Sequence, residues 1–233
     1  RTNPEANAIV AEFVRGKIRE IVKNPATAEL LCPKTYPIGA KRICMDTGYY
    51  ETYNRPNVSL IDVKTNPIVA ITPSGIKTTD AEYDLDIIVF ATGFDAMTGA
   101  LTRMNVTGVG GLKLEDHWRD GPRNYLGIFV SGFPNLFMIH GPGSPSVLAQ
   151  MITAGEMEVD WVIGFIDRVE SEGVRTLDVR REAETWWLAE VDRHADQTLY
   201  KLADSWYLGS NIEGKPRTFM IFIGGFDTYM NHL

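Results

Sequence analysis

The sequence of 233 residues predicts an α/β protein with a parallel sheet, and two stretches carry this prediction. Residues 86–95 contain four consecutive apolar residues without polar alternation, which predicts a strand buried on both faces. Residues 135–170 combine a short apolar run, a glycine loop and a long amphipathic helix. Strands that alternate with helices of this length are typical of α/β folds.

The first of these stretches ends in three small residues, Ala91, Thr92 and Gly93. At the C-terminal edge of a parallel sheet, small residues allow a ligand or another backbone to approach closely. These three residues are therefore candidates for cofactor binding. An ordinary turn after a strand is the alternative interpretation.

The chain begins with signals for two helices. Polar residues before Pro4 and an acid after it predict a helix start, and apolar residues at helical spacing continue to Asn24-Pro25, which ends the helix. A second helix is predicted for residues 26–31, and it stops at Cys32-Pro33. Neither helix carries residues that predict chemistry.

Residues 36–42 predict a loop, because Pro37 and Gly39 interrupt regular structure. The loop places Lys41 and Arg42 side by side. A pair of basic residues in a loop is often only surface charge, so the residues alone leave a binding role and a solvated surface open.

The middle of the chain predicts β-structure. Residues 58–63 are expected to form a strand, and residues 68–72 and 76–79 flank Pro73-Ser74-Gly75 as a hairpin with a tight turn. This hairpin leads into the strand expected at residues 86–91. The glycine cluster at residues 108–111 predicts a turn.

The C-terminal part repeats the order of strand, glycine loop and helix. Residues 125–130 and 135–139 predict strands, and a helix is expected from about residue 146 to 170. A helix N-terminus after a glycine loop presents free N–H groups to an anion. Ser146 stands where a dinucleotide-binding fingerprint would have its third glycine, so that fingerprint is incomplete.

A second long helix is expected over residues 181–200, and its adjacent Trp186 and Trp187 predict packing between domains. Residues 205–217 form a long loop of the kind that often closes over a ligand. Residues 218–223 predict a last strand.

Composition excludes several classes of function. The formal charge of −7 and a pI near 5.2 argue against nucleic acid, which requires a basic face. No apolar run has the length of a membrane span, so a cytoplasmic protein without a membrane partner is expected. The two cysteines and four histidines lack the spacing of metal ligands, and Ser144 lies outside a hydrolase elbow.

Four stretches together resemble the Baeyer–Villiger monooxygenases of the cyclohexanone and phenylacetone type, and the resemblance covers essentially the whole chain. They are residues 86–95, with Ala-Thr-Gly-Phe-Asp; residues 39–42, Gly-Ala-Lys-Arg; residues 141–146, Gly-Pro-Gly-Ser-Pro-Ser; and the stretch from Ser-Trp-Tyr at 205–207 to Gly-Lys-Pro-Arg at 214–217.

The resemblance implies a flavoprotein with Rossmann-like FAD and NADP domains. It implies that residues 1–44 are a helical segment inserted in the NADP domain, that residues 45–94 are the C-terminal part of that domain, and that residues 95–233 are the C-terminal part of the FAD domain. The family's glycine loops for FAD and NADP are absent from this sequence. The chain is therefore expected to be the C-terminal part of a longer polypeptide and to require its N-terminal portion as a partner.

The resemblance also implies roles for individual residues. Arg42 is expected to be catalytic through its fixed positive charge near the flavin, and Lys41 to contact the 2′-phosphate of NADPH. Met151 would contact the flavin through its backbone, although a core methionine is the alternative. Trp206 would close over the NADP ribose. The substrate pocket would be lined by Ser146, Val147, Leu148 and Met220.

The activity implied is the insertion of one oxygen atom of O2 next to a ketone carbonyl, which gives an ester or lactone with NADPH and FAD as cofactors. A related flavin monooxygenase that oxidises nitrogen or sulfur is one alternative. A non-catalytic piece that lacks the FAD loop is another.

Overall fold

The computed structural model describes residues 2–233, which divide into two compact units. One unit is Pro4–Gly93, and the other is Phe94–Leu233 together with the residues before Pro4. The division falls one residue before the boundary expected between residues 94 and 95. The assignment of the units to NADP and FAD domains stays a prediction.

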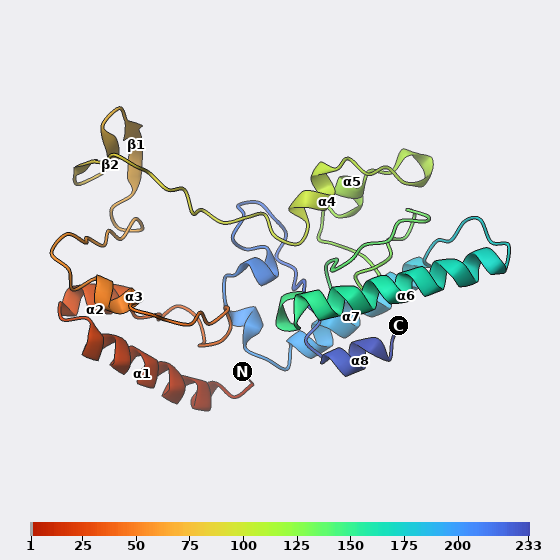
Figure 1. Cartoon of the computed structure of the whole chain (residues 1–233), viewed down its shortest axis with the longest axis horizontal. Coiled ribbons are helices and arrows are strands. Elements are labelled where there is room, and N and C mark those ends of the chain that lie inside the picture. The colour runs from red at the N-terminus through yellow and green to blue at the C-terminus, as the bar shows by residue number, and fades with distance from the viewer. Residues whose placement is uncertain (1) are drawn as a thin grey trace. The chain divides into compact units, whose positions relative to one another are not determined.

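The unit Pro4–Gly93 begins with two packed helices, α1 (Pro4–Ile21) and α2 (Pro25–Leu31), which appear in red and orange in Figure 1. Asn24 caps α2, because its Oδ1 accepts a hydrogen bond from the backbone N of Thr27 at 3.1 Å. Ile18 and Ala28 are buried where the helices meet. The predicted helices and the break between them are confirmed, and a short helix α3 (Tyr49–Thr52) follows.

The predicted hairpin is also confirmed. Strands β1 (Ile68–Thr72) and β2 (Gly75–Thr78) pair antiparallel, and an unpredicted third strand, β3 (Glu82–Asp84), pairs antiparallel with β2. Gly75 begins β2, and a Cβ there would collide with the carbonyl oxygen of Tyr83 on β3, so the pairing of these two strands requires glycine. The turn itself is held locally, because the Oγ1 of Thr72 accepts from the backbone N of Gly75 at 3.1 Å.

The strand predicted for residues 86–91 is wrong for this structure. The segment is extended but pairs with no strand of residues 2–233. Ile87, Val89 and Phe90 are 79%, 81% and 69% exposed instead of buried. A strand of a parallel sheet depends on hydrogen-bonded neighbours and on layers over both faces, and no described part of the chain supplies them. Residues 58–63 lack strand pairing for the same reason.

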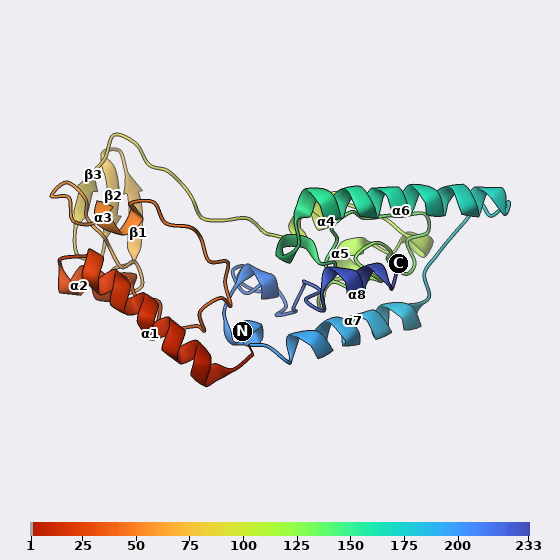
Figure 2. The ribbon, with the colours of Figure 1, turned by 60° about the horizontal axis from the view of Figure 1, so that its bottom comes forward.

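The unit Phe94–Leu233 is dominated by two long helices, α6 (Met151–Ser171) and α7 (Arg181–Ala195). Figure 2 shows the short C-terminal helix α8 (Phe226–Met230) between them. Two short helices, α4 (Gly99–Arg103) and α5 (Leu114–His117), precede them. Single 3-10 turns lie at η1 (Val109–Gly111), η2 (Ser146–Leu148), η3 (Tyr200–Leu202) and η4 (Trp206–Leu208).

Both long helices differ from their predicted bounds. The helix expected from about residue 146 is interrupted, because Ala149 is extended after η2 and Gln150 then caps α6. The Oε1 of Gln150 accepts from the backbone N of Thr153 at 2.5 Å. The helix expected to reach residue 200 ends at Ala195.

Three further strand predictions, for residues 125–130, 135–139 and 218–223, are wrong. Leu126, Gly127 and Asn135 have left-handed backbone angles, with φ of 61°, 74° and 60°, which interrupt a regular ladder. Residues 218–223 are extended, yet their backbone bonds go to different segments on either side. The result is a layer of irregular extended segments under the helices.

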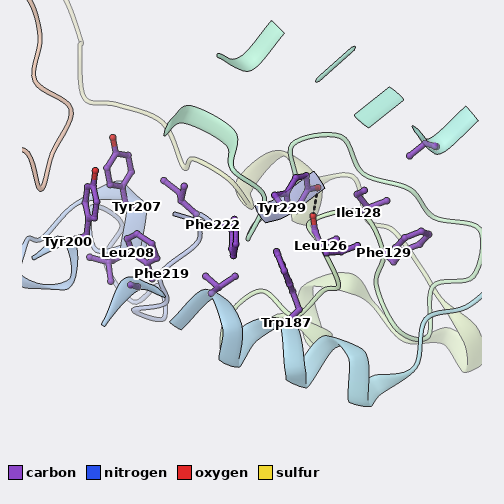
Figure 3. Close-up of a cluster of buried hydrophobic side chains, with 14 residues drawn as sticks. Leu126, Ile128, Phe129, Trp187, Tyr200, Tyr207, Leu208, Phe219, Phe222 and Tyr229 are labelled. Atoms are coloured by element: carbon purple, nitrogen blue, oxygen red, sulfur yellow. Dashed lines mark hydrogen bonds between the residues drawn. The ribbon is translucent and has the colours of Figure 1, made fainter. Parts of the chain in front are cut away.

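The core of this unit is aromatic. Trp187 stacks on Phe222 with ring centroids 4.9 Å apart, and Tyr229 packs beside both, as Figure 3 shows. Trp186 and Trp187 are predicted to pack between domains, but Trp187 is fully buried inside this single unit. The close packing holds α7 and α8 against the irregular layer.

Candidate functional site

The basic loop at residues 36–42 lines a cavity of about 470 Å³ within the unit Pro4–Gly93. The loop is anchored to α1, because the side-chain amide of Asn7 exchanges two hydrogen bonds with the backbone of Ile38, at 2.8 and 3.0 Å. Gly39 takes a left-handed φ of 80°, and the backbone N of Ala40 donates to the carbonyl of Pro37. These contacts define the direction of the two residues that follow.

Lys41 and Arg42 both lie on the wall of this cavity. The Nζ of Lys41 lies 4.5 Å from the centroid of the Tyr36 ring, a cation–π contact that leaves the charge available to an anion. Arg42 is exposed. Asp46 is the acid among the lining residues, and its Oδ1 accepts from the backbone N of Tyr49 at 2.7 Å. The wall is therefore basic over an aromatic floor.

The small residues Ala91, Thr92 and Gly93 are exposed in the same unit and do not line this cavity. Gly93 has a left-handed φ of 90°, and a Cβ there would meet nothing within 4 Å.

The glycine loop at residues 141–146 is held on both sides in the other unit. The backbone N of Gly143 donates to the carbonyl of Met220 at 2.8 Å, and the carbonyl of Ser144 accepts from the backbone N of Phe222 at 2.9 Å. The indole Nε1 of Trp187 donates to the carbonyl of Gly143 at 3.2 Å. A Cβ on Gly141 would collide with the backbone of Gly127. The loop therefore requires glycine for close packing.

The predicted pocket residues Ser146, Val147 and Leu148 form η2, directly after this loop. Ser146 is buried with a φ of 43°, an unusual conformation for a residue other than glycine. Its hydroxyl contacts the sulfur of Met97 at 3.9 Å. Leu148 lines an apolar cavity of about 280 Å³ together with Phe222 and Phe226.

The structure brings Trp206 and Met220 to the same region of this unit. Met220 is buried, and its backbone N donates to the carbonyl of Tyr207 at 2.9 Å. Trp206, in η4, packs edge-on against Tyr207 with ring centroids 4.4 Å apart. Met220 thus connects two segments by backbone hydrogen bonds. Its N–H donates to the turn that carries Trp206, and its carbonyl accepts from the glycine loop.

The long loop at residues 205–217 is attached to the start of its own unit. The Nζ of Lys215 contacts Asp95 Oδ1 at 2.5 Å and the carbonyl of Ala96 at 3.0 Å. The side chain of Asn211 donates to the carbonyl of Phe94 at 3.1 Å. The sequence does not predict this attachment, because the partners lie more than a hundred positions apart.

Met151 begins α6 and is partly exposed. Its carbonyl lies 2.7 Å from the Nε2 of His140, and the backbone N of His140 donates to Glu158 Oε2 at 2.8 Å. Glu158 is fully buried, and this burial raises the pKa of its carboxyl. Sequence reasoning misses both residues, since a single histidine and a single helical glutamate have no distinctive spacing.

Among residues 2–233, no helix combines the length and the apolar character required to cross a bilayer. Cys32 is buried and Cys44 is exposed, and both are free thiols. Burial raises the pKa of the Cys32 thiol.

Comparisons with known proteins give consistent matches. No protein-family profile matches the chain. The chain is 41% identical to a cyclohexanone 1,2-monooxygenase from an Acinetobacter species over 98% of its own length and 41% of that protein. It is 42% identical to a Baeyer–Villiger monooxygenase from Pseudooceanicola batsensis, over 99% of this chain and 42% of that protein.

It is also 41% identical to a phenazine N-monooxygenase from Lysobacter antibioticus, over 97% of this chain and 41% of that protein. A solved structure of an oxidized steroid monooxygenase bound to NADP superposes with a TM-score of 0.89 at 50% identity. That match covers 99% of this chain and 43% of the solved chain. The chain thus spans about two fifths of the length of these relatives.

Proposed function

Since the chain is homologous to the C-terminal portion of Baeyer–Villiger monooxygenases, we propose that it is part of an enzyme that converts a ketone into an ester or lactone. The reaction inserts one oxygen atom of O2 beside the ketone carbonyl and uses NADPH and FAD. The observation that carries the proposal is the basic wall of Lys41 and Arg42 on the cavity, found in a chain that matches these enzymes over nearly its whole length.

The residues present fit the two cofactors. For NADP(H), the cavity of about 470 Å³ combines the charge of Lys41 with the aromatic side chain of Tyr36, so it offers both a phosphate contact and a stacking surface. For FAD, the fully buried Ser144 hydroxyl in the glycine loop has no hydrogen-bond partner within residues 2–233. The first turn of α6 begins at Met151, after η2 and the extended Ala149.

FAD, when bound, supplies the redox and oxygen-transfer chemistry. Arg42 contributes a permanent charge that stabilises negative charge on the reacting oxygen atoms, and no proton donor is required of it. Lys41 binds the 2′-phosphate of NADPH, and Trp206 closes on its ribose. Ala91, Thr92 and Gly93 allow the cofactor close to the backbone, and Met151 contacts the flavin through its backbone.

The substrate side of the site consists of Ser146, Val147, Leu148 and Met220. Support comes from their common neighbourhood, because η2 continues the glycine loop and Met220 is hydrogen-bonded to that loop. Of these four residues, Leu148 lines the apolar cavity that also contains Phe222 and Phe226, and an apolar wall suits a ketone without charge.

We assign residues 1–44 to a helical insertion and residues 45–94 to the C-terminal part of a Rossmann-like NADP domain. Residues 95–233 are assigned to the C-terminal part of the FAD domain. Support comes from the exposed apolar segment at residues 86–91, which has the composition of a central strand. The N-terminal portion of the same polypeptide is the partner that would supply the neighbouring strands.

Arg42→Ala in the FAD-loaded enzyme tests the proposal. Loss of a fixed charge beside a developing negative charge is expected to lower the rate of ester formation by about 100- to 1,000-fold. Anaerobic reduction of the flavin by NADPH is expected to suffer less, by under about tenfold, because the oxygen atoms on which the charge is expected to act are absent from that reaction. Stopped-flow absorbance measures the reduction, and chromatography measures ester formed per NADPH consumed.

Arg55→Ala is the matched control, because Arg55 is an exposed arginine of the same unit outside the cavity wall. Normal ester formation per reduced flavin in Arg42→Ala would remove Arg42 from the reaction.

Oxidation of a nitrogen atom is a second candidate, and the phenazine N-monooxygenase at 41% identity favours it. The two activities separate in a product assay. A ketone gives an ester that contains one labelled oxygen atom from ¹⁸O2, whereas an aromatic nitrogen heterocycle gives an N-oxide that carries the label on its ring nitrogen.

A further inference from the structure

His140, Glu158 and Tyr229 form a buried polar cluster that the proposed reaction does not use. His140 directly precedes the glycine loop, Glu158 lies in α6, and Tyr229 lies in α8. Glu158 Oε2 accepts from the backbone N of His140 at 2.8 Å, and Glu158 Oε1 lies 3.2 Å from the hydroxyl of Tyr229. That hydroxyl lies 2.8 Å from the carbonyl of Leu126, along the dashed line in Figure 3.

The number of protons in this cluster determines its charge. The Tyr229 hydroxyl has one hydrogen but two neighbouring acceptors, and the Leu126 carbonyl is the nearer of the two. If the Tyr229 hydroxyl donates its hydrogen bond to the Leu126 carbonyl, the hydroxyl can only accept from Glu158. The Glu158 carboxyl must then carry a hydrogen. A neutral carboxylic acid satisfies every contact, since one oxygen donates to Tyr229 while the other accepts from His140.

The surroundings favour the neutral acid. Glu158 is fully buried and therefore removed from water, and within residues 2–233 His140 and Tyr229 are the titratable groups that face it. The His140 Nδ1 is 3.6 Å from Glu158 Oε2, which is too long for a hydrogen bond. Burial raises the pKa of Glu158 and outweighs the lowering effect of the hydrogen bond from the backbone N of His140.

The imidazole of His140 is directed at the start of α6. Its Nε2 donates to the carbonyl of Met151 at 2.7 Å, because a carbonyl can only accept. Gly155 leaves room for the ring, since a Cβ there would lie 2.8 Å from Nε2. The left-handed φ of 56° at His140 shows that packing overrides the usual backbone preference.

We propose that His140 and a neutral Glu158 act as positioning residues, which hold the Met151 carbonyl and the first turn of α6 in place for the flavin. The inference rests on the proposed function, because Met151 is the residue assigned to the flavin contact. Neither His140 nor Glu158 touches the reacting atoms in this assignment.

Glu158→Gln tests the charge state, because glutamine has the shape of the neutral acid and can donate to Tyr229. A carboxyl with a raised pKa binds more protons in the folded state, so its contribution to stability falls as the pH rises above the ordinary value of about 4.5. The melting temperature of the variant relative to wild type is therefore expected to rise by roughly 3–5 °C for each pH unit above about pH 5 over which Glu158 stays neutral.

Glu156→Gln, on the exposed face of α6, is the control, and its melting temperature is expected to follow that of wild type. If Glu158→Gln melts at a lower temperature than this control at about pH 8, Glu158 is charged in the folded protein. That result would overturn the neutral charge state proposed for Glu158.

Two variants test the positioning role in the FAD-loaded enzyme. His140→Asn keeps a residue type that tolerates the left-handed backbone, but its side chain is too short to reach Met151. Gly155→Ala places a methyl group against the imidazole. Both are expected to weaken FAD binding by about three- to tenfold, as for the loss of one hydrogen bond, with a matching shift in flavin fluorescence.

Gly164→Ala is the matched control on the same helix, because a Cβ there meets nothing within 4 Å. If wild type binds FAD and both test variants bind it as tightly as Gly164→Ala, the positioning role is overturned while the proposed function stands. If the complete wild-type enzyme binds no FAD, the proposed function fails.

Discussion

Lys41 provides the most direct test at the scale of a single residue. Its ammonium group lies on the cavity wall over Tyr36, where one charge can meet one phosphate group. Lys41→Ala in the complete enzyme is expected to raise the KM for NADPH by about 10- to 150-fold, as a charged hydrogen bond contributes roughly 1.5–3 kcal/mol. The KM for NADH is expected to change little, and steady-state kinetics with both coenzymes measures the difference.

Lys34→Ala serves as the control for that measurement. Lys34 is exposed and pairs with Glu29 at 2.6 Å, so its loss removes the same charge from a position outside the cavity wall. Equal losses for NADPH and NADH in Lys41→Ala would show that Lys41 does not bind the 2′-phosphate.

At the scale of an element, the loop at residues 205–217 is attached through Lys215 to Asp95 and Ala96. The loop is predicted to be mobile without nucleotide and ordered with it. Lys215→Met removes the attachment, and an ion pair of this kind contributes about 1 kcal/mol, so chymotrypsin is expected to cleave the loop about fivefold faster.

NADP⁺ is expected to restore protection of the loop in wild type, because Trp206 then contacts the nucleotide. Lys201→Met is the control, since Lys201 pairs with Asp192 and Asp196 outside the loop. Equal cleavage of wild type and Lys215→Met would show that the ion pair does not hold the loop, and equal cleavage with and without NADP⁺ would show a static loop.

At the scale of the whole molecule, the exposed apolar segment at residues 86–91 gives opposite expectations in two contexts. In the 233-residue chain produced alone, Val89→Lys is expected to change the free energy of unfolding by less than about 0.5 kcal/mol, because Val89 is exposed. In the complete enzyme, where a sheet would cover it, the same change is expected to cost about 3 kcal/mol or more.

Urea unfolding measures the free energy of unfolding of Val89→Lys and of wild type, both in the 233-residue chain alone and in the complete enzyme. Ile128→Lys is the control, because Ile128 is fully buried and its replacement is expected to destabilise both forms. The chain produced alone is also expected to be colourless. A flavin absorbance band in it would contradict the assignment of residues 86–91 to a sheet that the N-terminal portion completes. Equal costs of Val89→Lys in the two forms would mean that nothing covers the segment.

The composition of the candidate site is predictable from short motifs, whereas its contacts are not. Lys41 and Arg42 follow a proline and a glycine that predict their loop, and the glycine loop before η2 is visible as a motif. The pairing of Lys215 with Asp95, and of His140 with Glu158, joins residues 120 and 18 positions apart. No local pattern encodes such distances along the chain.

The sequence by itself determined the elements whose hydrogen bonds are local. Asn24-Pro25 separates α1 from α2, and Gly75 closes the hairpin, because caps and tight turns depend on a few adjacent residues. Only the tertiary structure decided the state of residues 86–91 and the contacts of the buried carboxyl of Glu158. A strand requires partners from elsewhere in the chain, and a buried carboxyl takes its charge from the groups that fold around it.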